Sequence, residues 1–200
     1  MCRFLILLIL ALSAAGCGER PSLRPLAGDA VVLAFGDSLT YGTGARESES
    51  YPEQLEQLIA RRVVRAGVPG EVTAQALARL PAMLDEHSPE LLLLCTGGND
   101  FLRRLGNRQA EDNVRAMVKL ARSRGVGVLL IGTPEPGFPV TPPPFYAAIA
   151  EEFGLPYEGE VIGEVLRDSS LKADQVHPNA RGYRIIAERI AGALKQSGAL

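Results

Sequence analysis

Three short motifs hold the side chains that could carry chemistry in this chain. They are Gly-Asp-Ser-Leu-Thr at residues 36–40, Gly-Gly-Asn-Asp at residues 97–100 and Asp-Gln-Val-His-Pro at residues 174–178. Serine, histidine and carboxylate groups are suited to nucleophilic catalysis, because a hydroxyl is a weak nucleophile until an aligned base removes its proton. Carboxylate, amide and imidazole groups are also metal ligands. The motifs therefore admit either a serine nucleophile or a metal-assisted reaction.

Each motif taken alone also has a purely structural explanation. Asp37 or Ser38 could cap a helix. Gly-Gly-Asn-Asp could form a turn, since Asn and Asp bond their own backbone and tolerate left-handed conformations. His177 could be an ordinary surface residue. A functional interpretation depends on whether the fold brings the three motifs together.

The apolar pattern predicts such a fold. Buried strands are expected at residues 31–35, 63–66, 91–95 and 126–131, with a weak fifth at 155–157, and helices at 52–62, 73–86, 110–124, 145–153 and 180–194. Continuous apolar strands separated by helices imply a parallel sheet covered on both faces. Right-handed crossovers then give a doubly wound, three-layer α/β/α sandwich of about five strands. Residues 133–144, rich in Pro and Gly, predict a rim loop after the fourth strand.

Function in such sheets lies at the carboxyl ends of the strands. The first motif follows the first strand, the second follows the third strand, and the third precedes the last helix. In this order and at one edge, the motifs resemble those of the SGNH (GDSL) hydrolases. Within that family the chain is similar to the compact bacterial arylesterases, lysophospholipases and acyl-CoA thioesterases. The resemblance covers residues 30–200 and implies a flavodoxin-like fold and hydrolysis of esters or thioesters through an acyl-enzyme, with no cofactor and no metal.

The resemblance also implies roles for individual residues. Ser38 corresponds to the nucleophile, His177 to the base that takes its proton, and Asp174 to the carboxylate that orients the imidazole. The oxyanion hole would consist of the Ser38 N–H, the Gly70 N–H and the side chain of Asn99.

Gly70 lies where the sequence departs most from the family pattern. Residues 68–73 read Val-Pro-Gly-Glu-Val-Thr, whereas the family usually reads Ser-Gly-Asp-Thr preceded by Asn-Ala. Arg65 stands where Asn is usual. Gly67 is the alternative candidate for the oxyanion hole, and the altered loop could change substrate preference.

Three further residues have less bearing on catalysis. His87 is expected where a helix ends before the third strand, because a basic group there interacts favourably with the helix C-terminus. Asp100 is expected to brace the turn of its motif. Cys95 lies in an apolar run and is expected to be a small buried hydrophobe.

The N-terminus predicts export rather than fold. Arg3 precedes an apolar run at residues 4–12, which is typical of a signal peptide and too short to span a bilayer at about 20 residues. Small residues then lead into Cys17, which resembles a bacterial lipobox with Ala14 in place of the usual Leu. We expect residues 1–16 to be a lipoprotein signal peptide, Cys17 to carry lipid, and residues 17–29 to be a flexible tether. The alternative is an ordinary signal peptide cut near Ala15.

A lipoprotein signal peptide predicts that the domain lies in the cell envelope, anchored to a membrane and facing the periplasm or exterior. Gly18 follows the Cys, where Asp would signal inner-membrane retention, so the outer membrane is favoured in a Gram-negative host. The formal net charge is -2 and no basic stripe is present, which argues against nucleic acid as a partner. We expect a monomer that acts on a small-molecule or lipid ester.

Three other functions remain open at this point. A carbohydrate acetyl esterase could use the same triad. A metal-dependent phosphoesterase is disfavoured, because two-metal sites need several His ligands and the chain has only 2 His. A catalytically silent envelope lipoprotein used for binding is also conceivable, since fold alone does not guarantee activity.

Overall fold

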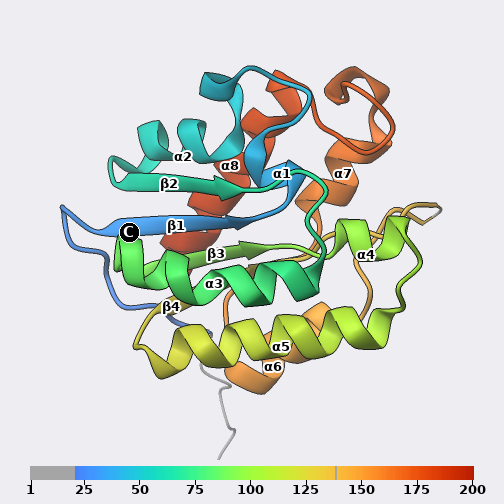
Figure 1. The fold of residues 1–200 in the computed structure, drawn as a ribbon. Coiled ribbons are helices and arrows are strands. Elements are labelled where there is room, and N and C mark those ends of the chain that lie inside the picture. Colours follow the sequence, from blue (N-terminus) through green and yellow to red (C-terminus); the bar gives the residue numbers. More distant parts are fainter. Residues whose placement is uncertain (1–20, 138) are drawn as a thin grey trace, which may run out of the picture.

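Five parallel strands form the centre of the molecule, in the order β2-β1-β3-β4-β5 (Figure 1). The computed structural model describes residues 21–137 and 139–200. The strands are β1 (Val31–Gly36), β2 (Arg62–Gly67), β3 (Leu91–Cys95), β4 (Gly127–Ile131) and β5 (Tyr157–Glu158). From β1 the chain adds β2 on one side of the sheet and then β3, β4 and β5 on the other side. The boundary between β1 and β3 is therefore the topological switch point, where such sheets bind ligands.

Helices cover both faces of the sheet, as Figure 1 shows. One face carries α2 (Tyr51–Ile59), α7 (Val161–Arg167) and α8 (Ala180–Gln196), and the other carries α3 (Thr73–His87), α5 (Asn107–Ser123) and α6 (Phe145–Phe153). Two short helices, α1 (Ser38–Tyr41) and α4 (Gly98–Leu102), lie at the carboxyl edge, and 3-10 turns occupy Glu47–Glu49 and Ser169–Leu171. The predicted three-layer α/β/α sandwich is confirmed.

The strand sequences explain why both faces are covered. Successive side chains of a strand point to opposite faces. In β1, Val32 and Ala34 pack into the core beneath α2 and α8, whereas Leu33 and Phe35 pack into the core beneath α3, α5 and α6. All four are fully buried, so the uninterrupted apolar run reflects burial on both sides.

Several element boundaries differ from the sequence-based expectations by a few residues, most clearly at the end of α2. The helix expected to reach residue 62 ends at Ile59, because Ala60 adopts a left-handed conformation (φ 50°) and β2 begins at Arg62. Leu58, expected on the buried face, is instead exposed. Helix α7 was not predicted from the sequence.

The signal peptide (residues 1–16), Cys17 and residues 18–20 lie outside the described residues. The rest of the predicted tether is not a free linker. The Leu23 N–H donates to the Ser197 carbonyl (2.8 Å), the Leu26 N–H donates to the Ala199 carbonyl (2.9 Å), and Leu26 is buried. Residues 23–26 are therefore attached to the C-terminal end of the chain. Among the described residues, no helix combines the length and apolarity needed to cross a bilayer.

Candidate active site

Ser38 is placed at the carboxyl edge by a sharp change from strand to helix. It follows β1 directly and is the first residue of α1, while Asp37 caps that helix by accepting a hydrogen bond from the Leu39 N–H (3.1 Å). Gly36 is required just before the turn, since a Cβ there would lie 1.8 Å from the Cys95 carbonyl oxygen of β3. The close packing of β1 on β3 thus fixes where the Ser38 hydroxyl emerges.

Asp174 and His177 come from the loop that precedes α8. The Asp174 Oδ1 accepts hydrogen bonds from the backbone N–H groups of Val176 and His177, both at 2.8 Å. The His177 carbonyl accepts from the Ala173 N–H (2.9 Å), which closes the turn. These local bonds bring the two side chains to the same side of the loop.

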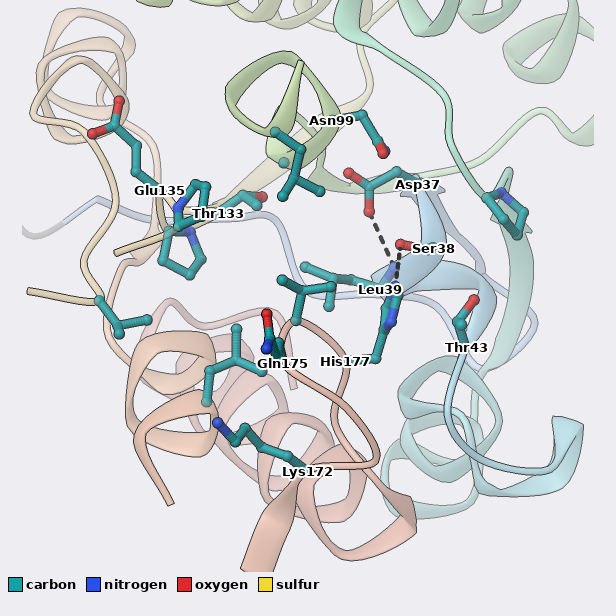
Figure 2. Close-up of a pocket in the computed structure, with 18 of the residues that line it drawn as sticks. Asp37, Ser38, Leu39, Thr43, Asn99, Thr133, Glu135, Lys172, Gln175 and His177 are labelled. Atoms are coloured by element: carbon teal, nitrogen blue, oxygen red, sulfur yellow. Dashed lines mark hydrogen bonds between the residues drawn. The ribbon is translucent and has the colours of Figure 1, made fainter. Parts of the chain in front are cut away.

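His177 joins the other two residues into one chain of hydrogen bonds. Its Nδ1 lies 2.7 Å from the Asp174 Oδ2, and its Nε2 lies 3.0 Å from the Ser38 Oγ. A carboxylate can only accept, so Nδ1 carries the proton and Nε2 is left with its lone pair toward the serine hydroxyl. Figure 2 shows the His177 ring pointing at Ser38. This arrangement can remove a proton from Ser38.

The Asp174 carboxylate is held in its charged form. Partial burial acts to raise its pKa, but the hydrogen bonds from the His177 ring and from the backbone N–H groups of Val176 and His177 outweigh this and lower the pKa below its ordinary value. An ionised partner at Nδ1 stabilises the imidazolium that forms when His177 accepts a proton.

The neighbouring carboxyl, Asp37, is in the opposite situation. It is fully buried, and desolvation raises its pKa to about 6, only partly offset by the hydrogen bond from the Leu39 N–H and by His177. Its second oxygen, Oδ2, has no hydrogen-bond partner among the described residues. Asp37 therefore carries a destabilising charge at neutral pH, directly beside Ser38.

Gly70 and Asn99 line the same cavity as Ser38. Gly70 has a positive φ of 80°, which an L side chain would adopt only with strain. The Asn99 Nδ2 donates to the Glu71 carbonyl (3.0 Å), which leaves its second N–H available. Gly67, the alternative candidate, belongs to β2 and packs against the backbone of α1, outside the cavity lining.

The cavity has a volume of about 500 Å³. Its walls beyond the predicted site residues are mainly apolar and come from the end of α4, from the segment after β4, from α7 and from the loop before α8. They include Leu102, Thr133, Pro134, Pro136, Val140, Leu166, Lys172, Gln175 and Val176. Figure 2 shows Thr133 and Glu135 on the side of the cavity across from Ser38, with Gln175 and Lys172 below. The predicted rim loop is thus one wall of the cavity. Its position after a strand was the signal that could have assigned it to the site.

Three residues lie outside the hydrogen-bonded chain of Ser38, His177 and Asp174, and Asp100 braces a different element from the turn of its own motif. Asp100 accepts from the N–H (2.8 Å) and Oγ1 (2.6 Å) of Thr73, and thereby braces the start of α3. His87 is the last residue of α3, outside the cavity lining. Cys95 is buried, and burial raises the pKa of its thiol well above the ordinary value, so it packs as a hydrophobe. Within residues 21–137 and 139–200, no group of three or more His, Cys, Asp or Glu side chains is arranged to hold a metal ion.

Comparisons with known proteins agree with this geometry. Residues 34–185 match the model of the GDSL-like Lipase/Acylhydrolase family. The chain is 31% identical over 200 residues to esterase TesA of Pseudomonas aeruginosa, covering 92% of this chain and 98% of that one. It is 30% identical over 182 residues to thioesterase 1/protease 1/lysophospholipase L1 of Escherichia coli K12, covering 87% of each.

Solved structures give the same result. The crystal structure of TesA superposes with a TM-score of 0.73 at 28% identity, covering 84% of this chain and 99% of that chain. The SGNH-hydrolase family esterase AlinE4 superposes with a TM-score of 0.63 at 30% identity, covering 86% and 98%. The chain therefore belongs to the GDSL-like lipase/acylhydrolase (SGNH) family and is a hydrolase that acts on ester bonds.

Proposed function

We propose that this enzyme cleaves carboxylic esters and thioesters through an acyl-enzyme formed on Ser38. The observation that carries the proposal is the continuous hydrogen-bonded chain from the Ser38 Oγ through both ring nitrogens of His177 to the Asp174 carboxylate. The Ser38 end of this series of hydrogen bonds lies in a cavity large enough for a small acyl ester.

The reaction follows from the positions of these groups. The Ser38 Oγ attacks the carbonyl carbon as its proton passes to the His177 Nε2, and the carbonyl oxygen becomes an oxyanion. The N–H groups of Ser38 and Gly70 and the Asn99 amide are the donors for that charge. The intermediate collapses, the alcohol or thiol leaves with the proton from His177, and water then hydrolyses the acyl-enzyme by the same steps.

The substrate class we infer is a short to medium acyl ester or thioester, of the arylesterase, lysophospholipase or thioesterase type. The apolar walls from Pro134, Val140 and Leu166 suit an acyl chain. The named relatives include an esterase and a thioesterase/lysophospholipase, which is in keeping with this class. Nitrophenyl esters of graded chain length, acyl-CoAs, lysophospholipids and acetylated sugars, assayed side by side, would locate the preference.

The acyl-enzyme is tested with a fluorophosphonate probe. The wild type should be labelled on Ser38, and Ser38→Ala should lose both the label and ester hydrolysis while keeping the wild-type melting temperature. His87→Ala is the matched control and should retain both. Undiminished turnover by Ser38→Ala would refute the proposal.

We also propose that the enzyme is a lipoprotein of the cell envelope, anchored through Cys17. The supporting observation is the apolar run at residues 4–12 followed by small residues before the Cys. Stable anchoring needs more than one acyl chain, which a diacylglyceryl-modified and acylated N-terminus supplies. Metabolic palmitate labelling and membrane association should be lost in Cys17→Ser. Mass spectrometry that finds an unmodified N-terminus downstream of Cys17 would contradict the anchor.

A further inference from the structure

The segment of residues 68–72, here called the Gly70 loop, contains an ion pair that the catalytic chain of hydrogen bonds does not use. The Glu71 carboxylate accepts from the Arg79 guanidinium through both of its oxygens, from Nε at 2.8 Å and from Nη2 at 2.7 Å. The Glu71 side chain is only 5% exposed. This two-point pairing fixes the orientation of Glu71 as well as its distance from Arg79.

Arg79 is in turn fastened to the sheet. Its Nη2 also donates to the carbonyls of Ala66 (3.2 Å) and Gly36 (3.4 Å), at the carboxyl ends of β2 and β1. Its guanidinium carbon lies 4.1 Å from the centre of the Phe35 ring, within the range of a cation–π contact. The ion pair therefore ties the Gly70 loop to the carboxyl ends of β2 and of β1, the strand that leads into Ser38.

The backbone of the same loop contacts the second side of the oxyanion hole. The Glu71 carbonyl accepts from the Asn99 Nδ2 (3.0 Å), and the Gly70 carbonyl accepts from the Arg103 Nη2 (2.7 Å). Asn99 lies in α4 and Arg103 is the residue that ends it. One loop is thus linked to β1, β2 and α4, by side-chain hydrogen bonds and by a backbone bond from the Val68 N–H to the Gly36 carbonyl (3.0 Å).

We propose that the Glu71–Arg79 ion pair is the positioning device of the oxyanion hole, holding the Gly70 N–H and the Asn99 amide at a fixed distance from Ser38. Glu71 and Arg79 are positioning residues, because neither lines the cavity in which substrate would bind. The inference rests on the proposed function.

Energetics favour a geometric role for this pair. Desolvation offsets much of the attraction within a buried ion pair, so such a pair is weak evidence of added stability. The Glu71–Arg79 pair lies where the direction of a backbone N–H matters, next to Gly70. An oxyanion donor displaced by about 1 Å can lower the rate by up to about 10²-fold, although the displaced group is not itself altered.

The test compares kinetics per active site, with active sites titrated by the fluorophosphonate probe. Glu71→Gln should lower kcat by about 10- to 10²-fold with little change in KM. Affinity for a boronic acid, which forms a tetrahedral adduct with the serine, should fall in parallel with kcat/KM. Arg115→Met, which breaks a pairing with Glu111 and Glu152 between α5 and α6, away from the cavity, is the control and should leave kcat unchanged; the Arg115 side chain is about as exposed as that of Arg79.

A double-mutant cycle with Asn99→Ala separates positioning from general destabilisation. If Glu71 acts through Asn99 and Gly70, the combined loss in Glu71→Gln/Asn99→Ala should be at least about tenfold smaller than the product of the single losses. Losses that simply multiply, or a kcat per active site within about twofold of wild type in Glu71→Gln, would overturn the inference.

A stability control keeps the test decisive. Should Glu71→Gln fold poorly because Arg79 is left unpaired, Glu71→Gln/Arg79→Met removes both charges and lets Met pack on Phe35. This variant should melt near the wild-type temperature yet retain the kcat defect; full activity would overturn the inference. Two other outcomes would instead refute the proposed function. These are a wild-type enzyme that hydrolyses none of the esters or thioesters, and a Ser38→Ala variant that hydrolyses them as well as the wild type.

Discussion

The two loops that complete the site are held in different ways. The loop bearing Asp174 and His177 is shaped mainly by contacts within itself, since Asp174 accepts from N–H groups two and three residues along the chain. The Gly70 loop is held by side chains from α3 and α4, among them Arg79 and Arg103. One loop can keep its shape when a neighbouring element moves, whereas the other depends on the positions of two helices.

This difference predicts two kinds of catalytic defect. Changes in the loop before α8 should act on proton transfer and leave the oxyanion hole intact. Changes at the Gly70 loop should weaken transition-state binding without altering the pH dependence. Two substitutions probe that division, and a third tests the buried carboxyl beside Ser38, in order of decreasing effect on turnover.

The largest effect is expected for Asp174→Asn. The substitution keeps the shape of the side chain but removes its charge and permits the tautomer in which the His177 Nε2 carries the proton, so kcat should fall by about 10³- to 10⁴-fold. The acid limb of kcat/KM should move to lower pH, because the imidazolium loses the charge that stabilises it. A pH profile of kcat/KM measures both. A limb that stays in place, with kcat nearly unchanged, would remove Asp174 from the triad.

An intermediate effect is expected for Asn99→Ala. Loss of one oxyanion donor should lower kcat by about 10²- to 10³-fold, with a smaller change in KM, since that interaction is strongest in the transition state. The pH at which the acid limb falls should stay where it is in the wild type. A raised KM with unchanged kcat would show that Asn99 contacts the substrate without stabilising the oxyanion.

The smallest effect on turnover, but a clear effect on stability, is expected for Asp37→Asn. Because the pKa of Asp37 is raised from 3.8 to about 6 in the folded protein, folding takes up a proton between these values. The free energy of unfolding therefore falls as pH rises through this window and stays lower above it. Asn removes that penalty, so stability near pH 8 should rise by on the order of 1–3 kcal/mol, with no gain below about pH 4.

Urea unfolding of wild type and Asp37→Asn across this pH range measures the difference. The expected curves converge at low pH and separate above about pH 6. Curves that run parallel from pH 4 to pH 8 would show that Asp37 is not the group responsible.

The same contrast explains what the sequence could predict. Asp174 and His177 were predictable because their spacing of three residues allows a local turn, and Ser38 because it follows a buried strand. The Glu71–Arg79 pair joins a loop to the middle of a helix, and no spacing of residues in the sequence indicates such a contact. The walls at Val140 and Leu166 depend on how α7 packs, and α7 itself was missed.

The predicted boundary between the tether and the domain differs from the structure for a related reason. The segment that contains Leu23 and Leu26 has the Pro and Gly content of a linker, yet its backbone pairs with residues at the far C-terminus. Tertiary contacts between the two ends of a chain leave no periodic signal in either end. Composition alone therefore placed the start of the ordered domain too late.

If the enzyme is anchored through Cys17 as proposed, the docked segment at residues 23–26 would set its orientation. Leu23 packs against Gly127, at the amino ends of the strands, whereas Ser38 and His177 lie at the carboxyl ends, about 20 Å away along a strand of six residues. Three residues separate Cys17 from Pro21, so the Cα atoms of these two residues can be at most about 14 Å apart. This length is shorter than the distance of about 20 Å from the amino ends to the carboxyl ends of the strands. The catalytic mouth would point away from the anchoring bilayer, toward substrates that arrive through water.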